Sequence, residues 1–119
     1  MSLINLGKAR QIIVFLYGLS PTDLEIVDLL FKRGPLKGDE IASLLGLTKA
    51  SLSKSFINLV NNGFVVRERV RGGMGKPAYV YRVDKQALVA KLLNDVKALS
   101  QLLETWIKET YSTADGSPP

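Results

Sequence analysis

The chain contains neither cysteine nor histidine. Without cysteine, a disulfide framework and thiolate metal sites are excluded. Without histidine, the most common metal ligand and the side chain that titrates nearest neutral pH are missing. No cluster of carboxylates compensates for these losses, so the sequence offers few of the groups that catalysis uses. We therefore expect a protein that is not an enzyme and that holds no metal or cofactor.

Long apolar runs are also missing. The longest in the N-terminal part is IIVFLY, residues 12–17, so the sequence predicts neither a signal peptide nor a membrane span. With 119 residues, of which 46% are hydrophobic, the chain suits one compact domain and an appended element. We expect a soluble, cytoplasmic protein.

Positive charge is concentrated in one segment. The formal net charge is +5, and residues 64–83 alone carry five Lys and Arg against one acidic residue. Nearly all of the excess therefore lies in a short stretch. Such a distribution is typical of an edge that binds a polyanion rather than of a uniformly solvated surface.

The same stretch contains a glycine-rich tip, RVRGGMGKPAYVYRV at residues 69–83. It is not a Walker A loop, because Val70 stands where the first glycine is needed and Pro77 stands where a Ser or Thr would hold magnesium. The residues after the tip alternate with period two, which predicts a second strand and hence a hairpin. One face of the first strand carries Val65, Arg67, Arg69 and Arg71. By themselves, these residues fit a solvated hairpin as well as polyanion contact.

Two segments precede this region. Residues 7–19 include a continuous apolar stretch that fits a short helix or a buried strand, and we favour the helix. Residues 20–34 are clearer, because Ser20 is a good N-cap, Pro21 suits the first helical position and Gly34 follows two cations. They predict a core helix.

A pair of helices joined by a tight turn follows. The first spans about 39–45, Gly46 ends it, and Thr48 caps the second, which Gly63 closes. A short helix, a brief turn with glycine and a second helix form a helix-turn-helix motif.

The second helix has two contrasting faces. The predicted buried face consists of Leu52, Phe56, Leu59 and Val60, and the opposite face of Ala50, Ser51, Lys54, Asn58 and Asn61. No Asp or Glu occurs between Thr48 and Val66, although solvated helices usually mix both signs. Ser and Asn are also common on plain helix surfaces, but the lack of acid favours a groove of nucleic acid.

The order helix, helix, short helix, turn, helix, strand, glycine tip, strand, helix resembles a known fold. The segment LGLTKASLSKSFINLVNNGFVVRERVRGGMGKPAYVYRV is similar to the winged helix-turn-helix domain of MarR-like and especially archaeal TrmB-like transcriptional regulators, whose second strand often begins after a Gly-Lys-Pro tip. The resemblance covers roughly residues 20–83. It implies a mainly α protein with a small β-hairpin (α+β).

The resemblance also implies contacts with double-stranded DNA. The second helix of the motif enters the major groove, and the hairpin, or wing, reaches the backbone or the minor groove. Its recognition-helix residues are Thr48, Lys49, Ser51, Ser53, Lys54 and Asn58, and its wing residues are Arg69, Arg71, Gly73, Gly75 and Lys76. No ligand-binding domain follows the wing as in the larger regulators, so the small-molecule effector stays unknown.

The last segment has the rhythm of a helix pair. Apolar residues step by three and four along Val89, Leu92, Val96, Leu99, Leu103 and Trp106, as at the a and d positions of a coiled coil. The helix could pack on its own domain, because the seam is under three heptads long. We favour a pair between two subunits, antiparallel or crossed, and hence a homodimer.

Together these patterns predict a winged helix-turn-helix domain over 1–84, a dimerisation helix over 85–111 and a disordered tail over 112–119. We expect a homodimeric, sequence-preferring, DNA-binding transcriptional regulator of archaeal type. Two alternatives stay open. One is a winged helix that contacts proteins of the transcription machinery, and the other is a protein that shapes DNA.

Overall fold

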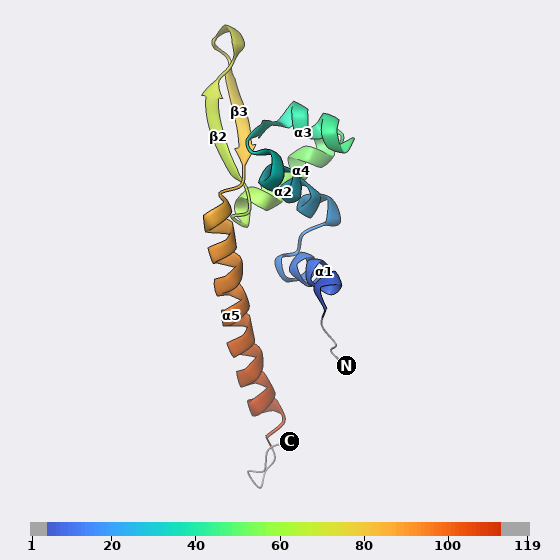
Figure 1. The fold of residues 1–119 in the computed structure, drawn as a ribbon, viewed down its shortest axis with the longest axis vertical. Helices are drawn as coiled ribbons and strands as arrows, with labels where there is room; N and C mark the ends of the chain where they lie inside the picture. Colours follow the sequence, from blue (N-terminus) through green and yellow to red (C-terminus); the bar gives the residue numbers. More distant parts are fainter. Residues whose placement is uncertain (1–4, 113–119) are drawn as a thin grey trace. The chain divides into compact units, whose positions relative to one another are not determined.

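The structure is a computed structural model that describes residues 5–112. Its elements are α1 (Leu6–Tyr17), α2 (Pro21–Arg33), β1 (Leu36–Lys37), α3 (Gly38–Leu45), α4 (Lys49–Asn61), β2 (Val66–Arg71), a short 3₁₀ turn (Gly73–Gly75), β3 (Pro77–Arg82) and α5 (Lys85–Thr110) (Figure 1). The chain divides into two compact units, residues 1–85 and 86–119. Beyond Ser112, the predicted tail lies outside the described residues. Among those residues, no helix has the length and apolarity that crossing a membrane requires.

The first two helices follow from local capping. Residues 6–17 form a helix and not a strand. Gly18 ends this helix in a left-handed conformation at φ 63°. In α2, the Ser20 hydroxyl accepts a hydrogen bond from the Asp23 N–H (3.0 Å), and the Asp23 carboxylate accepts one from the Ser20 N–H (2.9 Å). This capping box, with Pro21 in the first turn, confirms the predicted start of α2.

The helix-turn-helix motif is confirmed in α3 and α4. Gly46 ends α3 in the left-handed region at φ 66°, and the Thr48 hydroxyl accepts a hydrogen bond from the Ser51 N–H at 3.1 Å. These local signals fix the turn between the two helices.

The sheet contains the predicted hairpin and one strand that the sequence analysis missed. The strands are antiparallel in the order β1-β3-β2, and Leu36 of β1 stands opposite Tyr81 of β3. The first strand of the hairpin begins at Val66, so Val65, which was predicted to lie on this strand, precedes it. A helical domain with this small sheet confirms the winged-helix fold class.

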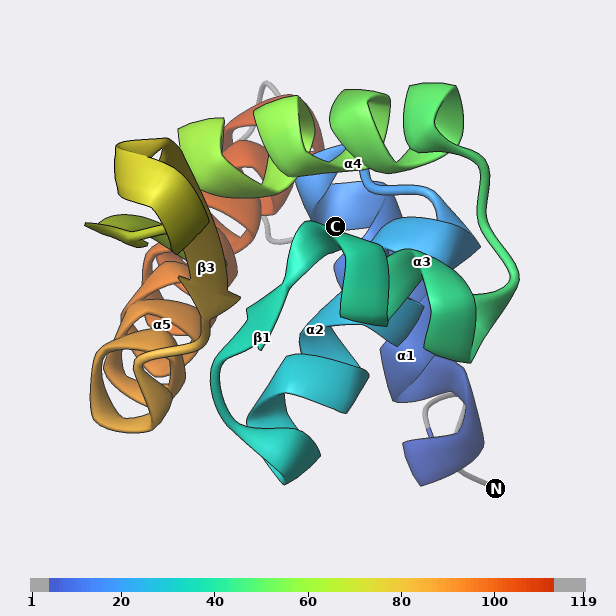
Figure 2. The ribbon, with the colours of Figure 1, turned by 90° about the horizontal axis from the view of Figure 1, so that it is seen from above.

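The core of the first unit is shared by its helices and the sheet. Figure 2 shows α4 lying across α2 and α3. The fully buried large side chains are Phe64, Ile26, Leu30, Ile41 and Leu59. The prediction that Val60 is buried was wrong: it is 37% exposed, and Ser55 instead completes the buried face of α4. Helical periodicity marks the centre of a buried face better than its edges.

The second unit is dominated by α5. The helix runs to Thr110, with ion pairs one turn apart between Lys91 and Asp95 (3.2 Å) and between Glu104 and Lys108 (2.9 Å). Such pairs support an isolated helix. Much of its apolar stripe is nevertheless exposed, and Trp106 is 53% exposed.

Candidate nucleic-acid interface

The exposed side of α4 is mostly polar and carries no acid. Its exposed residues are Lys49, Ala50, Ser51, Ser53, Lys54, Ile57, Val60 and Asn61. The nearest acidic residue along the chain after Thr48 is Glu68. Thr48 is also exposed, although its hydroxyl serves as the N-cap of the helix. The surface therefore presents lysine, serine and asparagine groups with no carboxylate from α4 among them.

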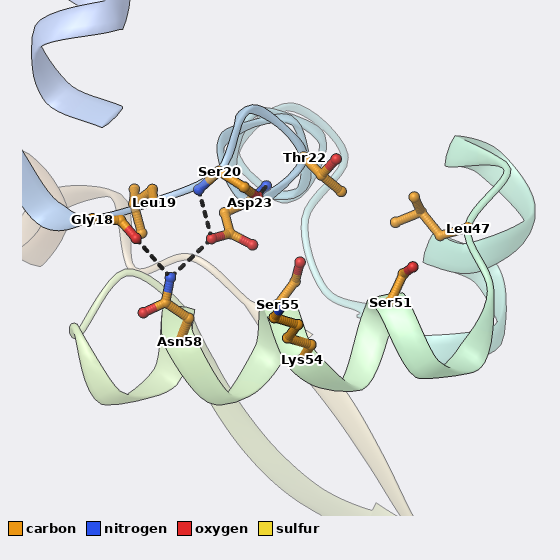
Figure 3. A pocket seen from close by; sticks show the side chains of 10 residues that line it. All are labelled: Gly18, Leu19, Ser20, Thr22, Asp23, Leu47, Ser51, Lys54, Ser55 and Asn58. Carbon is orange, nitrogen blue, oxygen red and sulfur yellow. Dashed lines mark hydrogen bonds between the residues drawn. The ribbon is translucent and has the colours of Figure 1, made fainter. Parts of the chain in front are cut away.

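Asn58 departs from the predicted exposed face, because its side chain bonds within the protein (Figure 3). Its amide nitrogen donates to the Asp23 carboxylate at 2.9 Å and to the Gly18 carbonyl at 3.3 Å. The Asn62 amide in turn donates to the Asn58 side-chain oxygen at 2.9 Å. Asn58 thus ties α4 to the start of α2 and is not available to read a base edge. Helical periodicity could not reveal this, since the loop before α2 comes from a distant part of the sequence.

Asp23 is the buried centre of this network, with 4% of its surface exposed. Burial by itself would raise the pKa of Asp23, but hydrogen bonds from Ser55, the Ser20 backbone, Asn58 and the Ser20 hydroxyl outweigh it and lower the pKa below its usual value. The carboxylate therefore stays charged at neutral pH. It accepts a hydrogen bond from Asn58 of α4 and lines a hollow together with Ser51 and Lys54 of the same helix.

Strand β2 of the hairpin carries its three arginines on one face. Arg67, Arg69 and Arg71 are exposed, and the residues between them are half-buried. Glu68, the acidic residue of this hairpin, lies on the other face and pairs with Arg82 at 2.5 Å. The expected face was confirmed for the arginines, whereas Val65 lies buried ahead of β2.

The tip of the hairpin is held by two backbone hydrogen bonds. The Gly72 N–H donates to the Lys76 carbonyl at 3.0 Å, and the Lys76 N–H donates to the Gly73 carbonyl at 3.2 Å. A Cβ atom at Gly72 would lie 2.3 Å from the Lys76 carbonyl oxygen, so only glycine fits. The predicted wing residues Arg69, Arg71, Gly75 and Lys76 together line a shallow hollow here.

A groove brings the helix and the hairpin together. It has a volume of about 390 Å³ and is lined by Ser53, Phe56, Ile57, Val60, Asn61, Arg67 and Tyr81. The Phe56 and Tyr81 rings stack 3.6 Å apart at an interplanar angle of 9°. The Arg67 guanidinium lies 3.6 Å from the centre of the Tyr79 ring, a cation–π contact that restrains it.

Because Arg67 lines this groove, the arginine face of β2 and the exposed side of α4 border the same hollow. Sequence reasoning included Arg67 in the cationic face but not among the candidate contacts, and it missed Ile57. The available signal for Arg67 was its period-two spacing with Arg69 and Arg71. The helical period was the available signal for Ile57, which lies three residues after Lys54 and four before Asn61 on the predicted exposed face.

The comparisons with known proteins agree on one class. Residues 16–85 match the family model described as sugar-specific transcriptional regulator TrmB. The chain is also 38% identical over 53 residues to YkoM of Bacillus subtilis, an uncharacterised helix-turn-helix-type transcriptional regulator; the match covers 44% of this chain and 34% of YkoM. The chain thus spans about a third of that relative.

Solved structures resemble the fold more completely. A protein from the archaeon Sulfolobus tokodaii has a TM-score of 0.69 at 21% identity, with 86% of this chain and 97% of that one covered. A transcriptional regulator homologue from Pyrococcus horikoshii has a TM-score of 0.56 at 22% identity, with 82% and 98% covered. At these identities the likeness extends to the fold alone.

Proposed function

We propose that this chain, which belongs to the TrmB family of transcriptional regulators, binds double-stranded DNA as a homodimer and prefers certain sequences. In this proposal α4 enters the major groove, and the β2–β3 hairpin reaches the backbone or the minor groove. The family is one of regulators and not of enzymes. Regulation of transcription through such binding is the function that the surface supports best.

One observation carries the proposal: the acid-free exposed side of α4 and the arginine face of β2 border one groove. Phosphates line both edges of a DNA groove, so a carboxylate on this surface would be repelled. Two acids of the first unit lie outside this groove, since Asp23 is buried and Glu68 is paired on the other face of the hairpin.

The residues proposed to contact DNA follow from their exposure. In α4 and its cap they are Thr48, Lys49, Ser51, Ser53 and Lys54, and in the hairpin they are Arg67, Arg69, Arg71, Gly73, Gly75 and Lys76. Asn58 is left out because of its bonds to Asp23 and Gly18. The serines and lysines of α4 offer donors to base edges, whereas the hairpin cations suit phosphates.

The proposed subunit contact is α5. Val89, Val96 and Leu103 recur on one stripe of this helix and are each about half exposed, at 47%, 46% and 48%. Leu92, Leu99 and Trp106 complete the stripe. Spacing of three and four residues suits burial against a second copy of the same helix. Two linked winged domains would then bind two half-sites.

A salt titration of binding to genomic DNA fragments tests the proposal. Neutralised phosphates release counterions, so the logarithm of affinity should fall with the logarithm of salt concentration by about 0.9 per contact. Arg71→Ala and Lys76→Ala should weaken binding to all sequences and make this slope shallower. Arg33→Ala is the matched control, since Arg33 is an exposed cation at the end of α2, and it should leave the slope unchanged.

A parent protein that binds no fragment at moderate salt would overturn the proposal and favour the protein-contact alternative. Equal slopes for the parent, Arg71→Ala and Lys76→Ala would remove the hairpin from the interface. Binding with equal affinity to every fragment would instead indicate a protein that shapes DNA.

A further inference from the structure

Ile57 is the most exposed large apolar side chain of α4, at 65%. The other large apolar residues of the helix are buried, apart from Val60 at the edge of the core. An exposed β-branched residue loses side-chain freedom in a helix and gains no packing in return. The first unit therefore gives no structural reason for isoleucine at this position.

The surroundings of Ile57 indicate what it faces. Ser53 and Asn61 lie one turn before and one turn after it, and all three line the groove opposite Arg67. Within residues 5–112, no carboxylate lines this groove. An apolar side chain framed by hydrogen-bonding groups and an arginine is poorly suited to a basic or wholly apolar partner. It suits the floor of a DNA groove, where apolar and polar atoms alternate.

We propose that Ile57 contacts the C5 methyl group of a thymine in the major groove, so that a thymine at a fixed place in each half-site is recognised through that methyl. The inference rests on the proposed binding of DNA through α4. Of the four bases, thymine alone presents a methyl group on the major-groove edge, and apolar side chains contact it. Ile57 then supplies specificity that the serines and lysines of α4 do not.

Replacement of thymine by deoxyuridine tests this contact, because it removes the methyl group and keeps the Watson–Crick pairing. A preferred duplex is first selected from a random pool with the full parent chain, and each thymine is then replaced in turn. One position in each half-site should bind about fourfold more weakly, as expected for the loss of one buried methyl group. Other positions should change little.

The variant Ile57→Ala should bind the selected duplex more weakly and should not distinguish thymine from deoxyuridine at the sensitive position. Alanine is the better helix former at an exposed site, and circular dichroism checks that the fold is kept. The matched control is Leu44→Ala, because Leu44 is an exposed apolar residue of α3 at 48% that does not line the groove. It should keep the parent's response.

The outcomes separate this inference from the function on which it rests. A parent that binds the selected duplex but tolerates deoxyuridine everywhere overturns the methyl contact and leaves DNA binding standing. The methyl contact is also overturned if Ile57→Ala responds to each deoxyuridine replacement as the parent does. A selected half-site that contains no thymine overturns it as well. A parent that selects no duplex overturns both. The parent's own comparison of thymine with deoxyuridine needs no variant, so the test does not depend on folding of the mutant.

Discussion

At the scale of single residues, Gly72 carries the most specific requirement in the hairpin. Alanine there would place its Cβ 2.3 Å from the Lys76 carbonyl oxygen, whereas a Cβ at Gly73 meets nothing within 4 Å. We expect Gly72→Ala to open the tip and to weaken DNA binding, because Lys76 is then displaced. Gly73→Ala is the adjacent control and should bind as the parent does. Equal binding by both variants would show that the tip conformation has no part in the interaction.

Asp23 and Asp28 occupy the same helix and should differ in their effect on stability. Asp23→Ala leaves the Asn58 amide and the Ser20 N–H without their buried acceptor, which should lower the free energy of unfolding by about 1–3 kcal/mol. Asp28 pairs with Arg10 at the surface at 2.6 Å, so Asp28→Ala should cost less than about 1 kcal/mol. Urea denaturation measures both. Similar losses would contradict the structural role assigned to Asp23.

The lowered pKa of Asp23 also predicts how stability depends on pH. Because the pKa is lower in the folded protein, the unfolded chain binds the proton more readily. The contribution of Asp23 is therefore present above the pKa of an unfolded aspartate, about 3.9, and is lost as the pH falls through the folded value. Denaturation at several values between about pH 6 and pH 2 should show a smaller decline for Asp23→Asn than for the parent. Parallel declines would contradict this expectation.

At the scale of elements, α4 should combine base reading with structural support at separate positions. Ser51→Ala and Lys54→Ala should change discrimination between bases by about 1–3 kcal/mol where the side chain reaches a base edge. Asn58→Ala should instead reduce stability and leave the ranking of DNA sequences unchanged, because its amide bonds within the protein. Affinities for a panel of single-base variants of the preferred duplex measure both effects. If Asn58→Ala changed the ranking of DNA sequences by affinity, this result would indicate that Asn58 contacts a base.

The elements differ in how far the sequence predicts them. The capping box of α2, the glycine that ends α3 and the glycine-rich hairpin depend on neighbouring residues, so local patterns sufficed. The two-residue strand β1 has no such pattern, because it exists through the pairing of Leu36 with Tyr81. For the same reason, the bonds of Asn58 and the exposure of Val60 could not be predicted. They depend on which distant segments pack against each side of α4.

At the scale of the whole molecule, the α5 stripe should determine the number of subunits. Leu99→Glu would place a charge in the proposed helix pair, where an unpaired buried charge costs on the order of several kcal/mol. We expect a folded monomer with weaker DNA binding, since two linked half-sites become one, or unfolding if folding requires association. Sedimentation measures the mass. Ser100→Glu, one residue further along in an exposed position, adds the same charge and should remain a dimer.

A parent protein that sediments as a monomer, at concentrations well above those that bind DNA, would contradict the subunit contact. The expectation that the winged domain binds DNA would not change. Its proposed interface lies wholly within the first unit, residues 1–85.

The stack of Phe56 on Tyr81 has a mechanical consequence. It couples α4 to β3 through two rigid rings, so the offset between the helix and the arginines of β2 is set before any ligand arrives. If α4 enters the major groove as proposed, the hairpin would meet the DNA backbone at a preset distance, and its contact would depend on the local groove width. DNA sequences that narrow or widen the groove would then differ in affinity, even where the change lies at base pairs that no side chain contacts. Phe56→Leu keeps an apolar side chain but removes the stack. It should reduce the differences in affinity among duplexes that differ only outside the contacted bases.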